Sequence, residues 1–195
     1  MKKKGKMKIT NIKKKINITN DWISGFTQSD GSFVISYSTI KTSRGIPVRP
    51  IPVFNITQSL IDYDLFIEIQ KYLGIGKVYK NRQNVTFVVK SIDEIVNVLL
   101  PLFDKHPLRG SKYNGYNIFK AVVLMIKDKR HLTLEGTIQI LNLSYFMNKE
   151  TSLRTENTKE ILLNKLKLKY GVLPIVPSLL AQAKGRSKNT SFRSL

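Results

Sequence analysis

Trp22 to Phe33 read WISGFTQSDGSF, and the spacing of the apolar side chains changes halfway along this stretch. Trp22 and Phe26 have the spacing of a short amphipathic helix, for which Asn20 and Asp21 are suitable N-cap residues. In the second half the period becomes two, which is typical of a strand. The pattern therefore predicts a short helix that passes directly into a strand, with an acidic residue at the junction.

Helix and strand patterns follow one another along the rest of the chain. Strands are expected at 32–38, 48–60, 76–80 and 84–90, and helices at 61–73, 91–103, 113–129, from Thr133 onward and at 158–169. The early prolines of the second strand indicate an edge or an irregular start, and Pro101 is expected to bend or end its helix. This order predicts an α+β fold in which one antiparallel sheet packs its apolar face on helices.

The charge is strongly unbalanced. The 195 residues include 33 Lys+Arg and 13 Asp+Glu, a formal net charge of +20, which favours a polyanion such as nucleic acid as the partner. No apolar run has membrane-spanning length, so no membrane partner is expected. The absence of cysteine excludes disulfides, zinc ribbons and Fe–S clusters. We expect a basic N-terminal arm at 1–19, a single domain at 20–173 and a basic, flexible tail at 174–195. The arm either lies on phosphates or serves as a solubilising tail.

Strand alternation predicts which side chains lie on the sheet face opposite the helices. These side chains are Ser36, Ser38, Arg49, Asn55, Lys77, Tyr79, Asn81, Thr86 and Lys90. They are polar or basic, and a major groove accepts a two-stranded ribbon of this kind. Any antiparallel sheet with one solvated face carries similar residues, so the pattern alone favours DNA only mildly.

Asp30 stands at the junction between the first helix and the first strand. Gly25 and Ser29 form a stripe of small residues on that helix, along which a second copy could pack closely by two-fold symmetry. Two Asp30 carboxylates would then lie close together, and Mg²⁺ could bridge them to phosphate oxygens. Asp-Gly is also a common helix-ending turn pair, and local chemistry alone favours that simpler interpretation.

Residues 23–31, ISGFTQSDG, resemble the LAGLIDADG motif of homing endonucleases. Further blocks are similar to segments of the same family, in the same order. They are VFNITQS (53–59), LGIGKVY (73–79), LFDKHPLRGSKYNGYNIFKAV (102–122) and HLTLEGTIQI (131–140). The resemblance covers about residues 20–148 and implies the αββαββα fold of the family, with a saddle-shaped sheet that reads DNA bases.

The resemblance also implies roles for individual residues. Asp30 and Gly31 match the metal site, and Gln58 matches a polar residue that orders water near the metal. A lysine near the scissile phosphate falls on Lys105, with Lys112 as a rival that is also a candidate DNA contact. The dimer interface matches Trp22, Gly25, Phe26 and Ser29. Gln28 replaces the first acid of the motif, and Asp62 stands where the family often has a basic residue.

The function implied is that of a site-specific double-strand DNA homing endonuclease that hydrolyses phosphodiester bonds with Mg²⁺, in a site that Mn²⁺ or Ca²⁺ can also occupy. One motif implies a homodimer on a long pseudo-palindromic target, or a separated half of a two-motif protein. An intron-encoded RNA maturase and an inactive nucleic-acid-binding protein are alternatives on the same fold. Relatives of this type imply an organelle, either mitochondrion or chloroplast.

Overall fold

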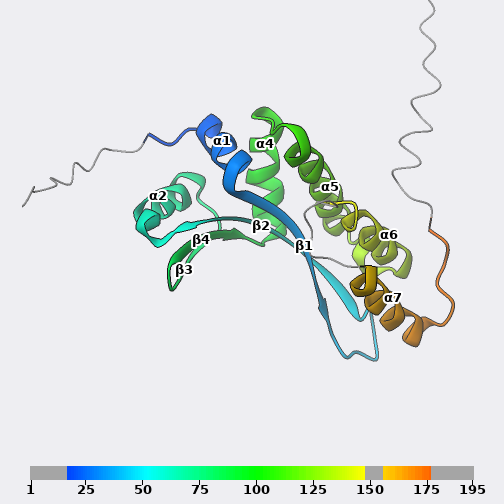
Figure 1. Ribbon diagram of the computed structural model, residues 1–195. Coiled ribbons are helices and arrows are strands. Elements are labelled where there is room, and N and C mark those ends of the chain that lie inside the picture. Colours follow the sequence, from blue (N-terminus) through cyan, green and yellow to red (C-terminus); the bar gives the residue numbers. More distant parts are fainter. Residues whose placement is uncertain (1–16, 148–155, 177–195) are drawn as a thin grey trace, which may run out of the picture.

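The computed structural model describes residues 17–147 and 156–176 (Figure 1). The helices are α1 (Asn20–Asp30), α2 (Tyr63–Leu73), α3 (Ile92–Glu94), α4 (Leu100–Lys105), α5 (Gly110–Lys127), α6 (Leu134–Ser144) and α7 (Glu156–Tyr170), and the strands are β1 (Gly31–Thr39), β2 (Val48–Ser59), β3 (Lys77–Asn81) and β4 (Asn84–Val89). Most of the predicted arm at 1–19 and of the tail at 174–195 lies outside the described residues. Within those residues, no helix is long and apolar enough to cross a membrane.

The four strands form one antiparallel sheet in the order β1-β2-β4-β3, so the predicted α+β fold is confirmed. Figure 1 shows the helices gathered along one side of this curved sheet. β4 pairs with β2 only from Phe54 onward. Pro50 and Pro52 therefore lie in a part of β2 that has β1 as its one neighbour, where a missing N–H leaves no gap in a second ladder.

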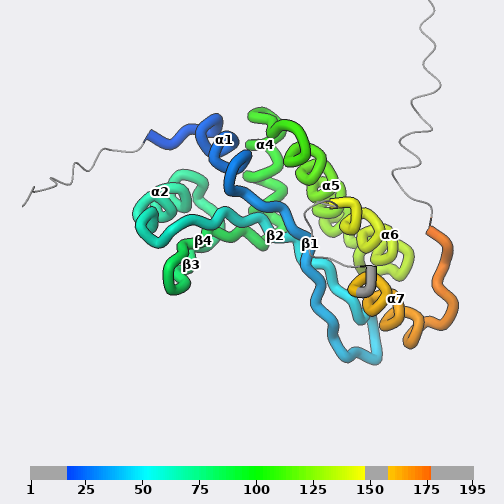
Figure 2. The backbone as a smooth tube through the Cα atoms, viewed as in Figure 1, coloured from blue at the N-terminus to red at the C-terminus, as the bar shows by residue number. Residues whose placement is uncertain are grey.

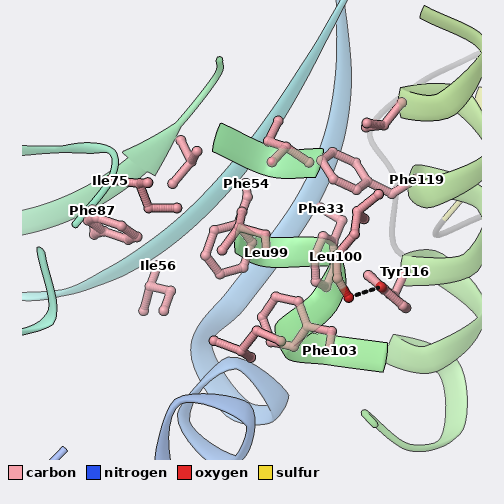
Figure 3. Packing of buried hydrophobic residues seen from close by; sticks show 14 of the residues in the cluster. Phe33, Phe54, Ile56, Ile75, Phe87, Leu99, Leu100, Phe103, Tyr116 and Phe119 are labelled. Carbon is pink, nitrogen blue, oxygen red and sulfur yellow. Dashed lines mark hydrogen bonds between the residues drawn. The ribbon is translucent and has the colours of Figure 1, made fainter. Parts of the chain in front are cut away.

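Aromatic side chains join the sheet to the helices. Phe33 of β1 lies 5.2 Å, between ring centroids, from both Phe54 of β2 and Phe119 of α5. Phe103 of α4 lies 5.6 Å from Phe33 and completes the cluster (Figure 3). Rings at such separations contribute packing beyond the area they bury. This cluster fixes β1, and hence the end of α1, against α4 and α5.

Several helix boundaries differ from the sequence predictions. The N-cap of α1 is Thr19, whose hydroxyl accepts from Trp22 N at 3.2 Å, and the predicted caps Asn20 and Asp21 begin the helix instead. Pro101 does not end its helix. A π-helical turn at 95–99 continues directly into α4, and Pro101 lies in the first turn of α4. α5 begins at Gly110 and not at 113, so the segment expected to be a loop already forms its first turn.

The loop between β1 and β2 is held by α7, at the far end of the hairpin from α1 (Figure 2). Lys169 Nζ donates to the carbonyl oxygens of Thr42 at 3.0 Å and Gly45 at 2.7 Å. Tyr170 OH donates to the same Gly45 carbonyl at 2.9 Å. The long β1–β2 hairpin is therefore supported at its tip.

One polar network lies at the contact between α4 and α5. Tyr116 OH donates to Leu100 O at 3.1 Å and to Asp104 Oδ1 at 2.8 Å, and Lys120 Nζ lies 2.6 Å from Asp104 Oδ2. Burial alone would raise the pKa of Asp104, but the hydrogen bonds from Lys120 and Tyr116 outweigh it and leave the pKa below its ordinary value. The network stabilises the ionised carboxylate.

This network predicts a pH-dependent contribution to stability. Because the folded-state pKa of Asp104 is depressed, its carboxylate stabilises the fold above about pH 4, and that contribution is lost as pH falls through the folded-state value. We expect Asp104→Asn to lower the melting temperature by about 2 °C at pH 7, after discounting for solvent screening, and by less at pH 3. Glu68→Gln, which breaks the exposed pair with Lys71, is the control and is expected to change little at either pH. A constant difference between pH 7 and pH 3 would contradict the assignment.

Candidate active site and nucleic-acid interface

The junction between α1 and β1 contains no loop, since α1 ends at Asp30 and β1 begins at Gly31. Gly31 N–H donates back to Thr27 O. A Cβ at position 31 would lie 2.5 Å from Thr27 Cγ2 and 2.7 Å from Thr27 O, so only glycine fits against the last turn of the helix. The sharp exit leaves Asp30 partly exposed at the end of α1.

Lys112, in the first turn of α5, reaches this junction. Its Nζ donates to Gly31 O at 2.5 Å. Partial burial lowers the pKa of Lys112, and the negative charge of Asp30 opposes this effect without cancelling it. The junction therefore brings together a carboxylate, a main-chain carbonyl and an ammonium group.

Lys105 lies elsewhere. It ends α4 and lines a hollow of about 410 Å³ together with Asn20 and Tyr72. Asn20 begins α1, and the 11 residues of that helix separate it from Asp30 by about 15 Å. The structure thus places Lys112, the rival candidate, beside Asp30, and places Lys105 near the other end of α1.

Gln58 is brought toward the junction by the β1–β2 ladder. Gly31 pairs with Ile56, so β2 carries Gln58 past the end of α1, where it is half-buried. Asp62 lies beyond the end of β2, in a short 3-10 helix at 60–62. The basic residue often found there in the family is absent from this chain.

Four residues of α1 form an outward stripe at helical spacing, namely Trp22, Gly25, Phe26 and Ser29. The Trp22 and Phe26 rings lie 5.0 Å apart between centroids. A Cβ at Gly25 would meet nothing within 4 Å, so the surface above it is open. The opposite side of α1 buries Ile23, Ser24 and Thr27. Gly25 and Ser29 are therefore exposed, whereas Trp22 and Phe26 are half-buried and also pack against the core.

The sheet register places the predicted polar residues on one face, away from the helices. Ser38 pairs with Arg49, Asn55 with Val88, and Tyr79 with Thr86, while Lys90 follows the end of β4. Ser36, Lys77 and Asn81 are an even number of residues from Ser38 or Tyr79 on the same strand, so they lie on the same face. The prediction omitted further side chains of this face that alternation would have found, namely Ser32, Thr57, Ser59 and Asn84.

The donor set of the junction fits a hard cation completed by other molecules. Among the described residues, no group of three or more His, Cys, Asp or Glu side chains could hold a metal ion by itself. Mg²⁺ commonly uses one or two carboxylates, water and substrate phosphates. Asp30 with adjacent main-chain carbonyls matches that pattern. The junction does not have the ligands of a site formed by protein groups alone.

These features define a class of α+β proteins in which a curved antiparallel sheet leaves one polar face free and a helix–strand junction carries a carboxylate. The chain belongs to the LAGLIDADG endonuclease family, whose sequence model matches residues 23–123. The resemblance seen in the motif and the downstream blocks is thereby confirmed.

Several known proteins are similar to this chain. The probable intron-encoded DNA endonuclease 1 of Mycosarcoma maydis is 38% identical over 179 residues, which are 90% of this chain and 64% of that protein. The probable intron-encoded endonuclease 2 of Neurospora crassa is 33% identical over 72% of this chain and 30% of its own length. The chain thus spans less than two thirds of these curated relatives.

Solved structures agree with this assignment. The homing endonuclease I-TnaI has a TM-score of 0.68 and 26% identity, and the match covers 79% of this chain and 99% of that one. The meganuclease I-SmaMI, bound to uncleaveable DNA, has a TM-score of 0.65 and 32% identity over 70% of this chain and 46% of its own. I-LtrWI bound to target DNA has a TM-score of 0.65 and 30% identity over 77% of this chain and 49% of its own.

Proposed function

We propose that this chain is a site-specific double-strand DNA endonuclease that acts as a pair of identical chains. The observation that carries the proposal is the junction of α1 and β1, where Asp30 is partly exposed and Lys112 Nζ is bonded to Gly31 O. A carboxylate in a chain of net charge +20 would repel DNA locally unless a cation joined it to phosphate. In this proposal the carboxylate would hold the cation and the ammonium would offset negative charge on the phosphate during hydrolysis.

Pairing through the α1 stripe would unite two junctions. Gly25 and Ser29 allow close approach of two helices, and Trp22 and Phe26 supply apolar area beside them. In each chain, Asp30 lies at the C-terminal end of the stripe. A two-fold pair would therefore present one carboxylate to each strand of a target that is itself approximately two-fold symmetric.

Each side chain has a separate task in this proposal. A divalent cation such as Mg²⁺, when bound, would activate water and stabilise the leaving oxygen. Asp30, with the neighbouring main chain at Gly31, would hold that cation. The Lys112 ammonium would stabilise negative charge at the scissile phosphate, and Gln58 would orient water.

The free face of the sheet would contact DNA. Arg49, Lys77 and Lys90 would bind phosphates, and shorter polar side chains such as Asn55 and Thr86 would meet base edges in the major groove. Thr57 Oγ1 and Thr86 Oγ1 lie 3.0 Å apart and join β2 to β4 across this face. We also propose an organellar setting, in keeping with relatives named as intron-encoded.

Lys112→Met is expected to lower the cleavage rate by about a hundredfold or more, because methionine keeps the length of the side chain and removes its charge. Lys105→Met removes the same charge from the α4 end and is the control, with cleavage expected within about threefold of wild type. Single-turnover cleavage at saturating protein measures both. Equal losses in the two variants would contradict the assignment of Lys112.

Cleavage of a randomised DNA library in the presence of Mg²⁺, followed by sequencing of the cut ends, tests the function itself. Reproducible cut sites of approximate two-fold symmetry are expected, and removal of the cation by chelation should stop cutting. The absence of cutting, together with tight binding of an intron RNA, would instead favour a maturase on this fold. Salt dependence of binding does not separate the two, because both partners are polyanions.

A further inference from the structure

The flank of α1 between the outward stripe and the buried side makes a second set of contacts. Asp21, Ser24 and Gln28, at helical spacing, all bond the segment 106–109 that joins α4 to α5. Ser24 Oγ donates to His106 O at 2.7 Å, and His106 Nδ1 lies 2.5 Å from Asp21 Oδ1. The same helix that presents the stripe therefore also holds the connection leading to Lys112.

Gln28 makes the contact of this set that lies nearest to α5. Its Oε1 accepts from Arg109 N at 2.9 Å, and its Nε2 has a longer contact of 3.5 Å with Arg109 O. The first distance is that of a good hydrogen bond and the second is at the weak limit. Acceptance of the Arg109 N–H is thus the main interaction of the Gln28 side chain.

α5 has no cap of its own to fix this end. Arg109 occupies the N-cap position and makes no side-chain capping bond, and Gly110 has a φ of +53°, so the turn into the helix relies on contacts from outside. Lys112 lies in the first turn of α5, so the start of the helix determines the place of its side chain. Its Nζ must reach Gly31 O, which lies at the end of the helix that carries Gln28.

We propose that Gln28 is a positioning residue for DNA cleavage, which fixes the start of α5 through Arg109 and so places Lys112 at the α1–β1 junction. This inference rests on the function proposed above. The two bonds, from Arg109 to Gln28 and from Lys112 to Gly31, tie the start of α5 to the α1–β1 junction at residues on both sides of Asp30 in the sequence. Movement of either helix would carry the lysine away from the carboxylate.

The proposal also explains the departure of this chain from its motif at position 28. A carboxylate and an amide both offer an oxygen acceptor, but the amide is uncharged. Gln28 accepts from the Arg109 N–H without adding a second negative charge near Asp30. In this proposal, hydrogen-bond acceptance is what position 28 contributes.

A double-mutant cycle tests whether Gln28 acts through Lys112. Gln28→Ala is expected to lower the single-turnover cleavage rate about tenfold in the wild-type background, as one lost hydrogen bond would. In the Lys112→Met background the same change is expected to lower it by less than about twofold, since the lysine to be positioned is gone. An equal loss in both backgrounds, or no loss in wild type, would overturn the proposal.

The control is Gln70→Ala in α2, which also removes a glutamine side chain bonded to the main chain, at Gly76 O over 2.9 Å. In each background Gln70→Ala is expected to cleave at the same rate as the parent protein, wild type or Lys112→Met. Gln28→Glu keeps the acceptor and is expected to retain most of the coupling to Lys112. If Gln28→Glu lost as much coupling to Lys112 as Gln28→Ala, hydrogen-bond acceptance from Arg109 N–H would not be the property through which residue 28 acts.

An arm that does not depend on cleavage separates this inference from the proposed function. Amide NMR of the full chain should show the Arg109 N–H exchanging with solvent at least about fivefold faster in Gln28→Ala, and unchanged in Gln70→Ala and Gln28→Glu. If wild type cuts no DNA yet Arg109 responds in this way, the function fails and the positioning stands. Unchanged Arg109 exchange in Gln28→Ala would overturn the positioning whatever the protein cuts.

Discussion

Asp30→Asn is expected to reduce DNA cleavage by at least about a thousand-fold, while binding to the target stays intact or tightens. Asparagine has the shape of aspartate but not its charge, so the junction geometry with Gly31 and Lys112 is retained. The cation loses its carboxylate ligand, and the DNA loses a repulsive charge beside its phosphates. Single-turnover cleavage in Mg²⁺ measures the first effect, and gel-shift titration at fixed salt measures the second.

Asp64→Asn is the matched control, because Asp64 is an exposed aspartate in the first turn of α2, apart from the junction. It changes the net charge by the same amount, so any general effect of charge on DNA affinity appears in both variants. Cleavage by Asp64→Asn is expected at the wild-type rate. Cutting that survives in Asp30→Asn would remove Asp30 from the catalytic role.

The fold could be predicted largely from local patterns. The change of period within 22–33 placed α1 and β1, Gly74 marked the end of α2, and Thr133 marked the start of α6, and all of these are confirmed. Each signal lies within a few residues of the boundary it sets, either as a cap or as a left-handed glycine at φ 67°. Boundaries with no such signal, such as the start of α5, were wrong.

The site could be predicted only where its residues are neighbours in sequence. Asp30 and Gly31 were predicted as the metal site because the motif they match is one continuous stretch of sequence. Lys105 and Lys112 both lie about 80 residues from the junction in the sequence. Which of the two reaches it depends on where α5 starts in space, and sequence spacing does not give that. The contact of Gln28 with Arg109 was missed for the same reason. The two residues lie far apart in the sequence, and neither has a local pattern that indicates the contact.

The polar face of the sheet is an intermediate case. Alternation gave the correct face for Ser38, Asn55 and Thr86, because one parity decides every residue of a strand. It does not give their neighbours, since the order β1-β2-β4-β3 places β4 and not β3 beside β2. The pairing of Thr57 with Thr86 requires both that order and the register of β2 with β4.

Gly25→Arg is expected to convert the proposed pair into single chains and to abolish double-strand cleavage. Because a Cβ at Gly25 meets nothing within 4 Å in the chain itself, the arginine fits the isolated molecule. Arginine is also a better helix former than glycine by about 0.5–1 kcal/mol, so the melting temperature of the single chain should stay the same or rise. Two arginines facing each other across a close helix contact would instead clash and repel. The variant therefore separates loss of pairing from loss of folding, which most interface substitutions do not.

Leu168→Arg on α7, where the leucine is 88% exposed, adds the same side chain away from the stripe and serves as the control. Sedimentation of wild type and Leu168→Arg on target DNA should give two chains per duplex, and Gly25→Arg one. Two chains per duplex with full cleavage by Gly25→Arg would place the interface elsewhere on the molecule. A wild type that binds and cuts as a single chain would contradict pairing altogether, because one junction supplies only one Asp30 for two strands. The stoichiometry on DNA thus decides whether α1 is the seam between two copies.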